Sequence, residues 1–241
     1  MSAVIQANGV GRSFGAHEVL RDVNIEVRAG EVLALIGPNG GGKSTLLLLM
    51  AGLITPTSGS LTVDGRTASE VALEVFGTVG LITARPGFYP LLTGAENLDF
   101  FGGLFGLSKQ DVRARTEPIA DELGLTGQLD KQVEGYSSGM QQKLALVRAL
   151  LMNPKVLLLD EPTANLDPVS ADTLCSTMRR RADEGLAVCI VTHDLHAVEQ
   201  VCDRVAVVSG TVRHEQAIED SQRTRAASSL LEVYRTHVEA G

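Results

Sequence analysis

Apolar and polar positions along the chain follow a strand pattern at first, then a helical pattern, then a strand pattern again. Near the start, alternating and continuous apolar runs predict strands at 3–10, 19–27, 31–36 and 60–63. Helical spacing follows from about 86 to 154 and predicts helices near 95–101, 109–123 and 140–151. Strand pattern returns at 156–159, 187–192 and 205–209, with a helix near 169–184. An α/β core interrupted by a helical insert is therefore expected.

This pattern also predicts how the chain is divided. We expect one domain over 1–214, with a core lobe formed by 1–85 and 155–214 and a helical lobe formed by 86–154. The remaining residues, 215–241, are polar and are expected to form a tail that is helical near 228–238.

Composition narrows the functional classes. The chain has 241 residues and a formal net charge of −8, which argues against a general nucleic-acid binder or a polybasic membrane-surface protein. Its three cysteines are far apart and form no CxxC pair, which is typical of reduced thiols rather than of a disulfide or zinc framework. No basic segment leads into an apolar one at the start, and the longest apolar run, 46–54, is too short to span a bilayer. We expect a soluble, cytoplasmic chain that another chain would hold at a membrane.

A glycine-rich loop follows the continuous apolar run of 32–36, which is typical of a strand buried on both faces. The loop matches G-x-x-x-x-G-K-[ST] and precedes a helix predicted at 43–53, the context in which this motif binds phosphates. Backbone N–H groups would face the phosphates, Lys43 would bridge the β- and γ-phosphates, and the Ser44 hydroxyl would ligate Mg²⁺. The alternative is an ordinary glycine-rich turn. The expected ATP-binding residues are Gly37, Pro38, Asn39, Gly40, Gly41, Gly42, Lys43, Ser44 and Thr45.

Two adjacent carboxylates end the apolar strand at 156–159. Carboxyl ends of parallel strands line the ligand crevice of such sheets, so Asp160 is placed to hold Mg²⁺ through water. Glu161 could polarise a water molecule for attack on the γ-phosphate, as a general base. Taken alone, the segment could be only an acidic turn after a core strand.

Residues 135–148, GYSSGMQQKLALVR, precede that strand. Alone they are explained by an amphipathic helix with Ser137 as its N-cap. In order with the phosphate loop and the acidic strand, they resemble the signature of the ABC-transporter ATPases, usually written LSGGQ. The similarity extends over about 3–213 and implies that Ser137, Ser138, Gly139 and Met140 contact ATP held by a second subunit.

This resemblance implies roles for further residues. Phe14 matches the aromatic residue that stacks on adenine, although a core phenylalanine is the alternative. His193 matches the switch histidine that contacts the γ-phosphate, although a lone histidine at a strand end can be structural. The D-loop, which contacts the opposite subunit, is matched by Asn165, Leu166 and Asp167.

Two positions depart from the family pattern. Ala84 occupies the place of a glutamine that usually helps to ligate Mg²⁺ and senses the transport partner, and water would have to fill that ligand position. In the signature, Ser138 and Met140 replace the usual residues, but the backbone can still present N–H groups to a phosphate.

The resemblance implies a P-loop NTPase core of the RecA type, with an antiparallel β subdomain and an inserted helical lobe. It implies an ATPase subunit, using ATP and Mg²⁺, that closes head-to-tail on a second ATPase subunit and serves separate transmembrane permease subunits. Segments 88–106 and 228–234 resemble those of exporter ATPases, which favours export, with no nucleic-acid partner expected. The alternative is a soluble ATPase of the same fold that clamps a non-membrane partner; a GTPase or small-molecule kinase is weaker because no N-K-x-D motif is present.

Overall fold

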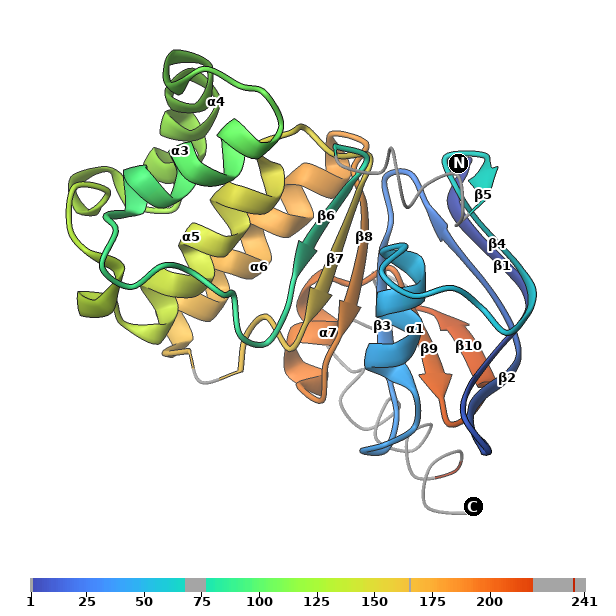
Figure 1. The fold of residues 1–241 in the computed structure, drawn as a ribbon. Helices are drawn as coiled ribbons and strands as arrows, with labels where there is room; N and C mark the ends of the chain where they lie inside the picture. Colours follow the sequence, from blue (N-terminus) through green and yellow to red (C-terminus); the bar gives the residue numbers. More distant parts are fainter. Residues whose placement is uncertain (1, 68–76, 165, 219–235, 237–241) are drawn as a thin grey trace.

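A computed structural model describes residues 2–67, 77–164, 166–218 and 236 of the chain. Its elements form a central sheet, a second sheet on one side of it and a group of helices on the other (Figure 1). Within the described residues, no helix combines the length and the apolar character needed to cross a membrane.

The central sheet has six strands in the order β10-β9-β3-β8-β7-β6. All neighbours among them pair in parallel except β10, which is antiparallel to β9. The strands are β3 (Val32–Ile36), β6 (Val79–Ile82), β7 (Val156–Asp160), β8 (Ala187–Val191), β9 (Arg204–Val208) and β10 (Val212–Ala217).

Side chains of the central strands alternate between two hydrophobic cores, because successive residues of a strand point to opposite faces. In β3, Ala34 packs into the core on the helical side, whereas Leu33 and Leu35 pack into the core against the second sheet. This alternation explains why β3 is apolar at every position: both faces are covered.

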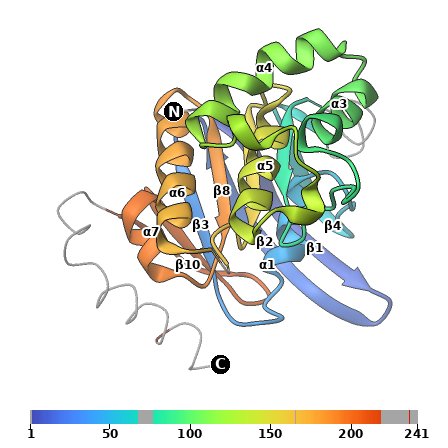
Figure 2. The ribbon, with the colours of Figure 1, turned by 90° about the vertical axis from the view of Figure 1, so that its left-hand side faces the viewer.

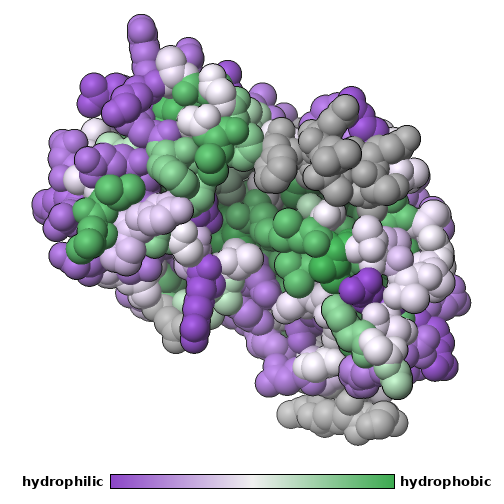
Figure 3. Space-filling view, in the orientation of Figure 1, coloured by the Kyte–Doolittle hydropathy of each residue, from purple (hydrophilic) through white to green (hydrophobic). Residues whose placement is uncertain are grey.

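The second sheet is antiparallel, in the order β2-β1-β4-β5. Its strands are β1 (Ala3–Phe14), β2 (His17–Arg28), β4 (Ser58–Val63) and β5 (Arg66–Thr67). Helix α1 (Lys43–Met50) contributes Leu46, Leu49 and Met50 to the core between the two sheets. In the view of Figure 3, apolar surface gathers over the middle of the molecule around α1, whereas the outer helices are mostly hydrophilic.

The helical insert contains α3 (Gly94–Leu104), α4 (Lys109–Glu122), α5 (Ser138–Leu150) and two 3₁₀ turns at Thr126–Gln128 and Val133–Gly135. Both α3 and α4 begin with a capping box, in which the N-cap side chain and the third helical residue bond each other's backbone N–H. Helices α6 (Pro168–Asp183) and α7 (Leu195–Val201) follow β7 and β8. Figure 2 shows α5 and α6 in front of the strands of the central sheet.

Most predicted elements are present, with shifted ends. The helix predicted at 43–53 stops at Met50, because Gly52 takes a left-handed φ of 69° that a helix cannot continue through. Helix α7 was not expected. Residues 215–217 were expected to belong to the polar tail, but they pair with β9 as part of β10, so the core extends beyond 214. The helix expected near 228–238 falls almost entirely outside the described residues.

The three cysteines are free and buried, as expected for reduced thiols. Burial raises the pKa of Cys175 to about 11 and that of Cys189 to about 12. Such thiols stay protonated at neutral pH and are poor nucleophiles, so they act as core side chains.

Candidate functional site

Three neighbouring parallel strands, β3, β8 and β7, end at the same edge of the central sheet. The glycine-rich loop follows β3, Asp160 ends β7 and His193 comes two residues after β8. Together they line an open cavity of about 690 Å³. Its lining comprises His17, Val19, Asn39, Gly40, Gly41, Gly42, Lys43, Ser44, Thr45, Ala84, Asp160, Glu161, Val191 and His193.

Glycines are required in this loop because it passes close to other backbone. A Cβ at Gly37, whose φ is 150°, would lie 2.0 Å from the carbonyl oxygen of Val208 at the end of β9. A Cβ at Gly42, whose φ is 92°, would lie 2.5 Å from Leu20 of β2. The loop is therefore pressed between the two sheets, with its backbone open to the cavity, as a phosphate cradle requires.

The Lys43 side chain is nearly buried within the loop. Its Nζ donates hydrogen bonds to the carbonyl oxygens of Gly37, at 2.9 Å, and Pro38, at 2.8 Å. An ammonium has three donors, so these two bonds leave one for an anion. Burial lowers the pKa of Lys43, and the nearby charges of Glu161 and Asp160 oppose that shift.

Glu161 and His193 face each other across the ends of β7 and β8. The Nε2 of His193 lies 3.5 Å from Oε1 of Glu161, and the backbone N–H of His193 donates to Oε2 at 3.4 Å. Glu161 has a left-handed φ of 49°, uncommon for a residue with a side chain, and its N–H donates to the Val191 oxygen at 2.8 Å. Burial raises the pKa of the Glu161 carboxyl, whereas His193 and Lys43 lower it. A half-buried carboxylate with a raised pKa is suited to accept a proton.

Ser44 and Asp160 are the oxygen donors that could hold Mg²⁺ in this cavity. Among the described residues, His, Cys, Asp and Glu side chains do not gather in groups of three that could bind a metal by themselves. This donor set fits a cation that takes most of its ligands from phosphates and water. Ala84 lines the same cavity and presents a methyl group where the family pattern has an amide oxygen.

Phe14 is 47% exposed, so it is not a core residue. It ends β1 and pairs across the hairpin with His17. The sequence reasoning missed His17 and Val19, which line the cavity. The sequence gives no local signal for them, because the start of β2 shows no alternation of buried and exposed residues, and only the fold brings that hairpin beside the phosphate loop.

Residues 137–140 are not part of the cavity lining given by the described residues. Ser137 is the N-cap of α5, as predicted, and its Oγ accepts a hydrogen bond from the Met140 N–H at 3.2 Å. The Met140 side chain packs against the hydrophobic core. A Cβ at Gly139 would meet the Ser170 hydroxyl at 2.9 Å, so the first turn of α5 touches α6.

Of the three residues expected to form the D-loop, Asn165 lies outside the described residues. Leu166 packs against the core, and Asp167 is the N-cap of α6, where its carboxylate accepts from the Ser170 N–H at 2.9 Å. Asp167 therefore has a structural role in the single chain.

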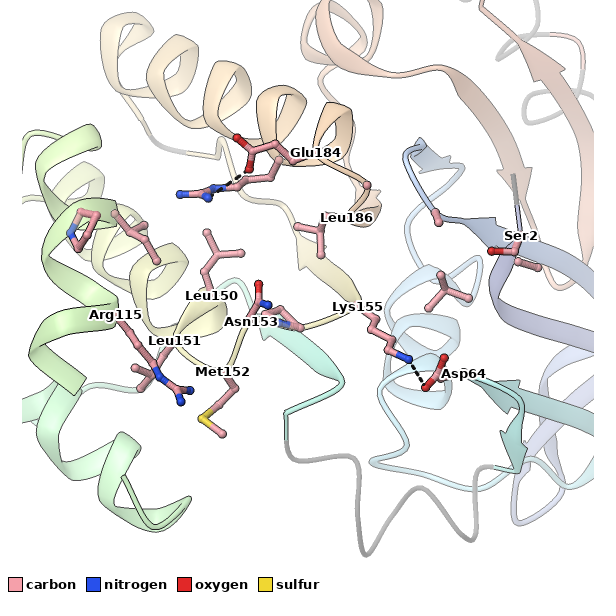
Figure 4. Close-up of a pocket in the computed structure, with 18 residues that line it drawn as sticks. Ser2, Asp64, Arg115, Leu150, Leu151, Met152, Asn153, Lys155, Glu184 and Leu186 are labelled. Atoms are coloured by element: carbon pink, nitrogen blue, oxygen red, sulfur yellow. Dashed lines mark hydrogen bonds and ion pairs between the residues drawn. The ribbon is translucent and has the colours of Figure 1, made fainter. Parts of the chain in front are cut away.

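A larger hollow, of about 1110 Å³, lies elsewhere, between the amino-terminal strand and the ends of α4, α5 and α6 (Figure 4). Two ion pairs lie among its lining residues: Lys155 Nζ is 2.7 Å from Asp64 Oδ2, and Arg181 Nη1 is 3.3 Å from Glu184 Oε2. None of the phosphate-loop residues lines it, and we assign it no role in nucleotide binding.

Comparisons with known proteins agree with this geometry. The family model of the ABC transporter matches residues 20–164. Two Bacillus subtilis proteins are similar: the uncharacterized ABC transporter ATP-binding protein YdbJ, 36% identical, and the ABC transporter ATP-binding protein NatA, 32% identical. The alignments cover 95% and 93% of this chain and 74% and 92% of those proteins. A Nod factor export ATP-binding protein I from Cupriavidus metallidurans is 32% identical over 86% of this chain and 69% of its own length.

Solved structures give the same fold. An ATP-binding subunit of an ABC transporter has a TM-score of 0.85 and 29% identity, over 97% of this chain and 99% of that chain. A dimeric ATP-binding cassette bound to ADP and Pi after hydrolysis has a TM-score of 0.80 and 26% identity, over 89% and 99%. The expected P-loop NTPase fold is thereby confirmed, and the chain belongs to the ABC transporter family as an ATP-binding ATPase subunit.

Proposed function

We propose that the cavity at the ends of β3, β7 and β8 is the ATP-hydrolysing site of a transporter subunit. The observation that carries this proposal is the convergence of the phosphate loop, Asp160, Glu161 and His193 on one cavity. The loop backbone and Lys43 bind the phosphates, and Ser44 and Asp160 hold Mg²⁺, which neutralises phosphate charge. Phe14 stacks on the adenine.

In this proposal Glu161 is the general base. Its carboxylate takes a proton from a water molecule as that water attacks the γ-phosphorus, and the bond to the β-phosphate oxygen breaks to give ADP and phosphate. His193, within 3.5 Å of Glu161, orients the carboxylate and contacts the γ-phosphate. The raised pKa of Glu161 supports this role.

We further propose that two ATPase subunits, identical or different, close head-to-tail around ATP. The signature segment 137–140 begins α5 and lies apart from the cavity of its own chain, so a second subunit would have to supply it. A helix N-terminus presents N–H groups to an anion, which suits contact with the γ-phosphate. Hydrolysis would remove that contact and release the pair.

Two variants test these roles. Lys43→Ala should weaken ATP binding about ten- to a hundredfold, because it removes a charge-assisted bond. Glu161→Gln should bind ATP but hydrolyse it at least about a hundredfold more slowly, and should accumulate as an ATP-dependent dimer in light scattering. Normal hydrolysis by Glu161→Gln would exclude it as the base.

We propose a separate transmembrane permease as the partner, with this chain on the cytoplasmic face of the membrane. Supporting this, apolar side chains are exposed together where the helical insert begins. The Tyr89 ring lies 4.8 Å from that of Phe100, and Leu91 is 70% exposed. Leu104 is one helical turn beyond Phe100 and is also exposed. Beneath them, Arg148 stacks on Phe101, which fixes the patch.

Pull-down of the tagged chain from detergent-solubilised native membranes tests this partner. A polytopic membrane protein should be recovered with the wild type and lost with Leu91→Asp, while Leu53→Asp, an exposed leucine outside the insert, should retain it. Recovery of soluble partners alone would favour the soluble clamp instead. We propose export as the direction, in line with the similarity to the Nod factor export ATP-binding protein. In reconstituted vesicles, export would move substrate away from the side that carries the ATPase.

A further inference from the structure

A cation covers one face of the aromatic ring beside the phosphate cavity. The guanidinium carbon of Arg12 lies 4.4 Å from the centre of the Phe14 ring. Arg12 is itself anchored, because its Nη1 donates a hydrogen bond to the Thr55 carbonyl oxygen at 2.7 Å. The end of β1 is further tied to the same loop by the Ser13 N–H, which donates to Thr57 Oγ1 at 3.0 Å.

The other side of this ring is placed for a ligand. Phe14 pairs directly with His17 across the hairpin, and directly paired residues project from the same face. His17 lines the phosphate cavity, and Val19, two residues further along the same strand face, lines it too. Phe14 is not itself among the residues that line the cavity, but its direct partner is, so the ring lies beside the cavity. Phe14 is 47% exposed although Arg12 covers one face of its ring.

We infer that Arg12 is a positioning residue for the nucleotide base: it holds one face of Phe14 so that the opposite face receives a purine. A guanidinium over an aromatic face is attracted by the electrons of the ring, and the bond to Thr55 fixes that stack in place. A stack contacts the flat face of a base and not its hydrogen-bonding edge, so adenine and guanine are accepted alike. This inference rests on the proposed ATP site and assigns Arg12 to it.

Equilibrium binding of three probes tests the inference: ATP, GTP and inorganic tripolyphosphate, which has no base. In Arg12→Met the Kd values for ATP and GTP should rise about two- to fivefold, whereas that for tripolyphosphate should not change. In a Phe14→Ala background, Arg12→Met should have no further effect on any probe. The control Arg21→Met removes a positive charge from the same hairpin, at a residue that pairs with Glu18, and should leave all three Kd values unchanged.

Equal weakening of tripolyphosphate would show a general effect of charge or folding and would overturn the inference. So would an Arg12→Met effect that persists without Phe14, an effect on one nucleotide alone, or no effect on ATP. Lys43→Ala distinguishes a failure of the Arg12 inference from a failure of the proposed ATP site. If ATP binding depends on Lys43 but not on Arg12, only this inference fails; if the wild type binds no ATP, the proposed site fails with it.

Discussion

If Glu161 is the general base, as proposed, its pKa links ATP hydrolysis at a single site to pH. Burial raises the pKa of its carboxyl above the ordinary value, and a general base must be ionised to act. As the pH falls, kcat/KM for ATP should therefore decline earlier than it would with an exposed glutamate, whose pKa is about 4.3. The pH profile of ATP hydrolysis measures this limb directly.

Replacing His193 should shift the pKa of Glu161 in a known direction. The charge of His193 lowers the Glu161 pKa, so His193→Gln should move the acid limb of kcat/KM to higher pH, besides reducing the rate. A limb that stays in place or moves to lower pH would contradict the contact between these two side chains.

At the scale of elements, two helices with similar caps allow structural and functional effects to be separated. Ser137 caps α5 in the signature segment, and Ser108 caps α4 in the same insert. Alanine at either position should lower the free energy of unfolding by about 1 kcal/mol, because a backbone N–H loses its acceptor. Urea denaturation measures this change.

Only Ser137→Ala should also weaken ATP-dependent dimer formation, measured in the Glu161→Gln background by light scattering. Ser108→Ala is its matched control, since it removes the equivalent N-cap hydrogen bond, from the Asp111 N–H, at the start of a different helix of the insert. Equal loss of dimer in both variants would mean that the signature acts through stability alone.

At the scale of the whole molecule, head-to-tail closure predicts complementation between two inactive variants. In a mixed dimer of Lys43→Ala and Ser137→Glu, one site receives both defects and the other receives neither. An equal mixture should recover about a quarter of wild-type hydrolysis, because half of the dimers are mixed and each has one intact site. ATPase assays of each variant alone and of the mixture measure it, and an inactive mixture would indicate that each site is completed within one chain.

The sequence by itself determined the phosphate loop, the acidic strand end and most of the elements. The reason is local. The motif from Gly37 to Ser44 would present consecutive backbone groups to a phosphate, so it can be found in a short stretch of sequence. A continuous apolar run such as 156–159 directly predicts a strand that is buried on both faces. Ser137 likewise predicts the start of α5, because an N-cap side chain bonds a backbone N–H only three positions away, at Met140.

Only the tertiary structure decided the rest, because it depends on contacts between distant segments. Strand order brings His193 to Glu161, 32 positions away, and the hairpin places Phe14 and His17 beside the loop. Arg12, which stacks on Phe14, is bonded to the backbone of Thr55, 43 positions away along the chain. Strand β10 was missed because an edge strand alternates only weakly, and its pairing with β9, not its composition, makes it a strand.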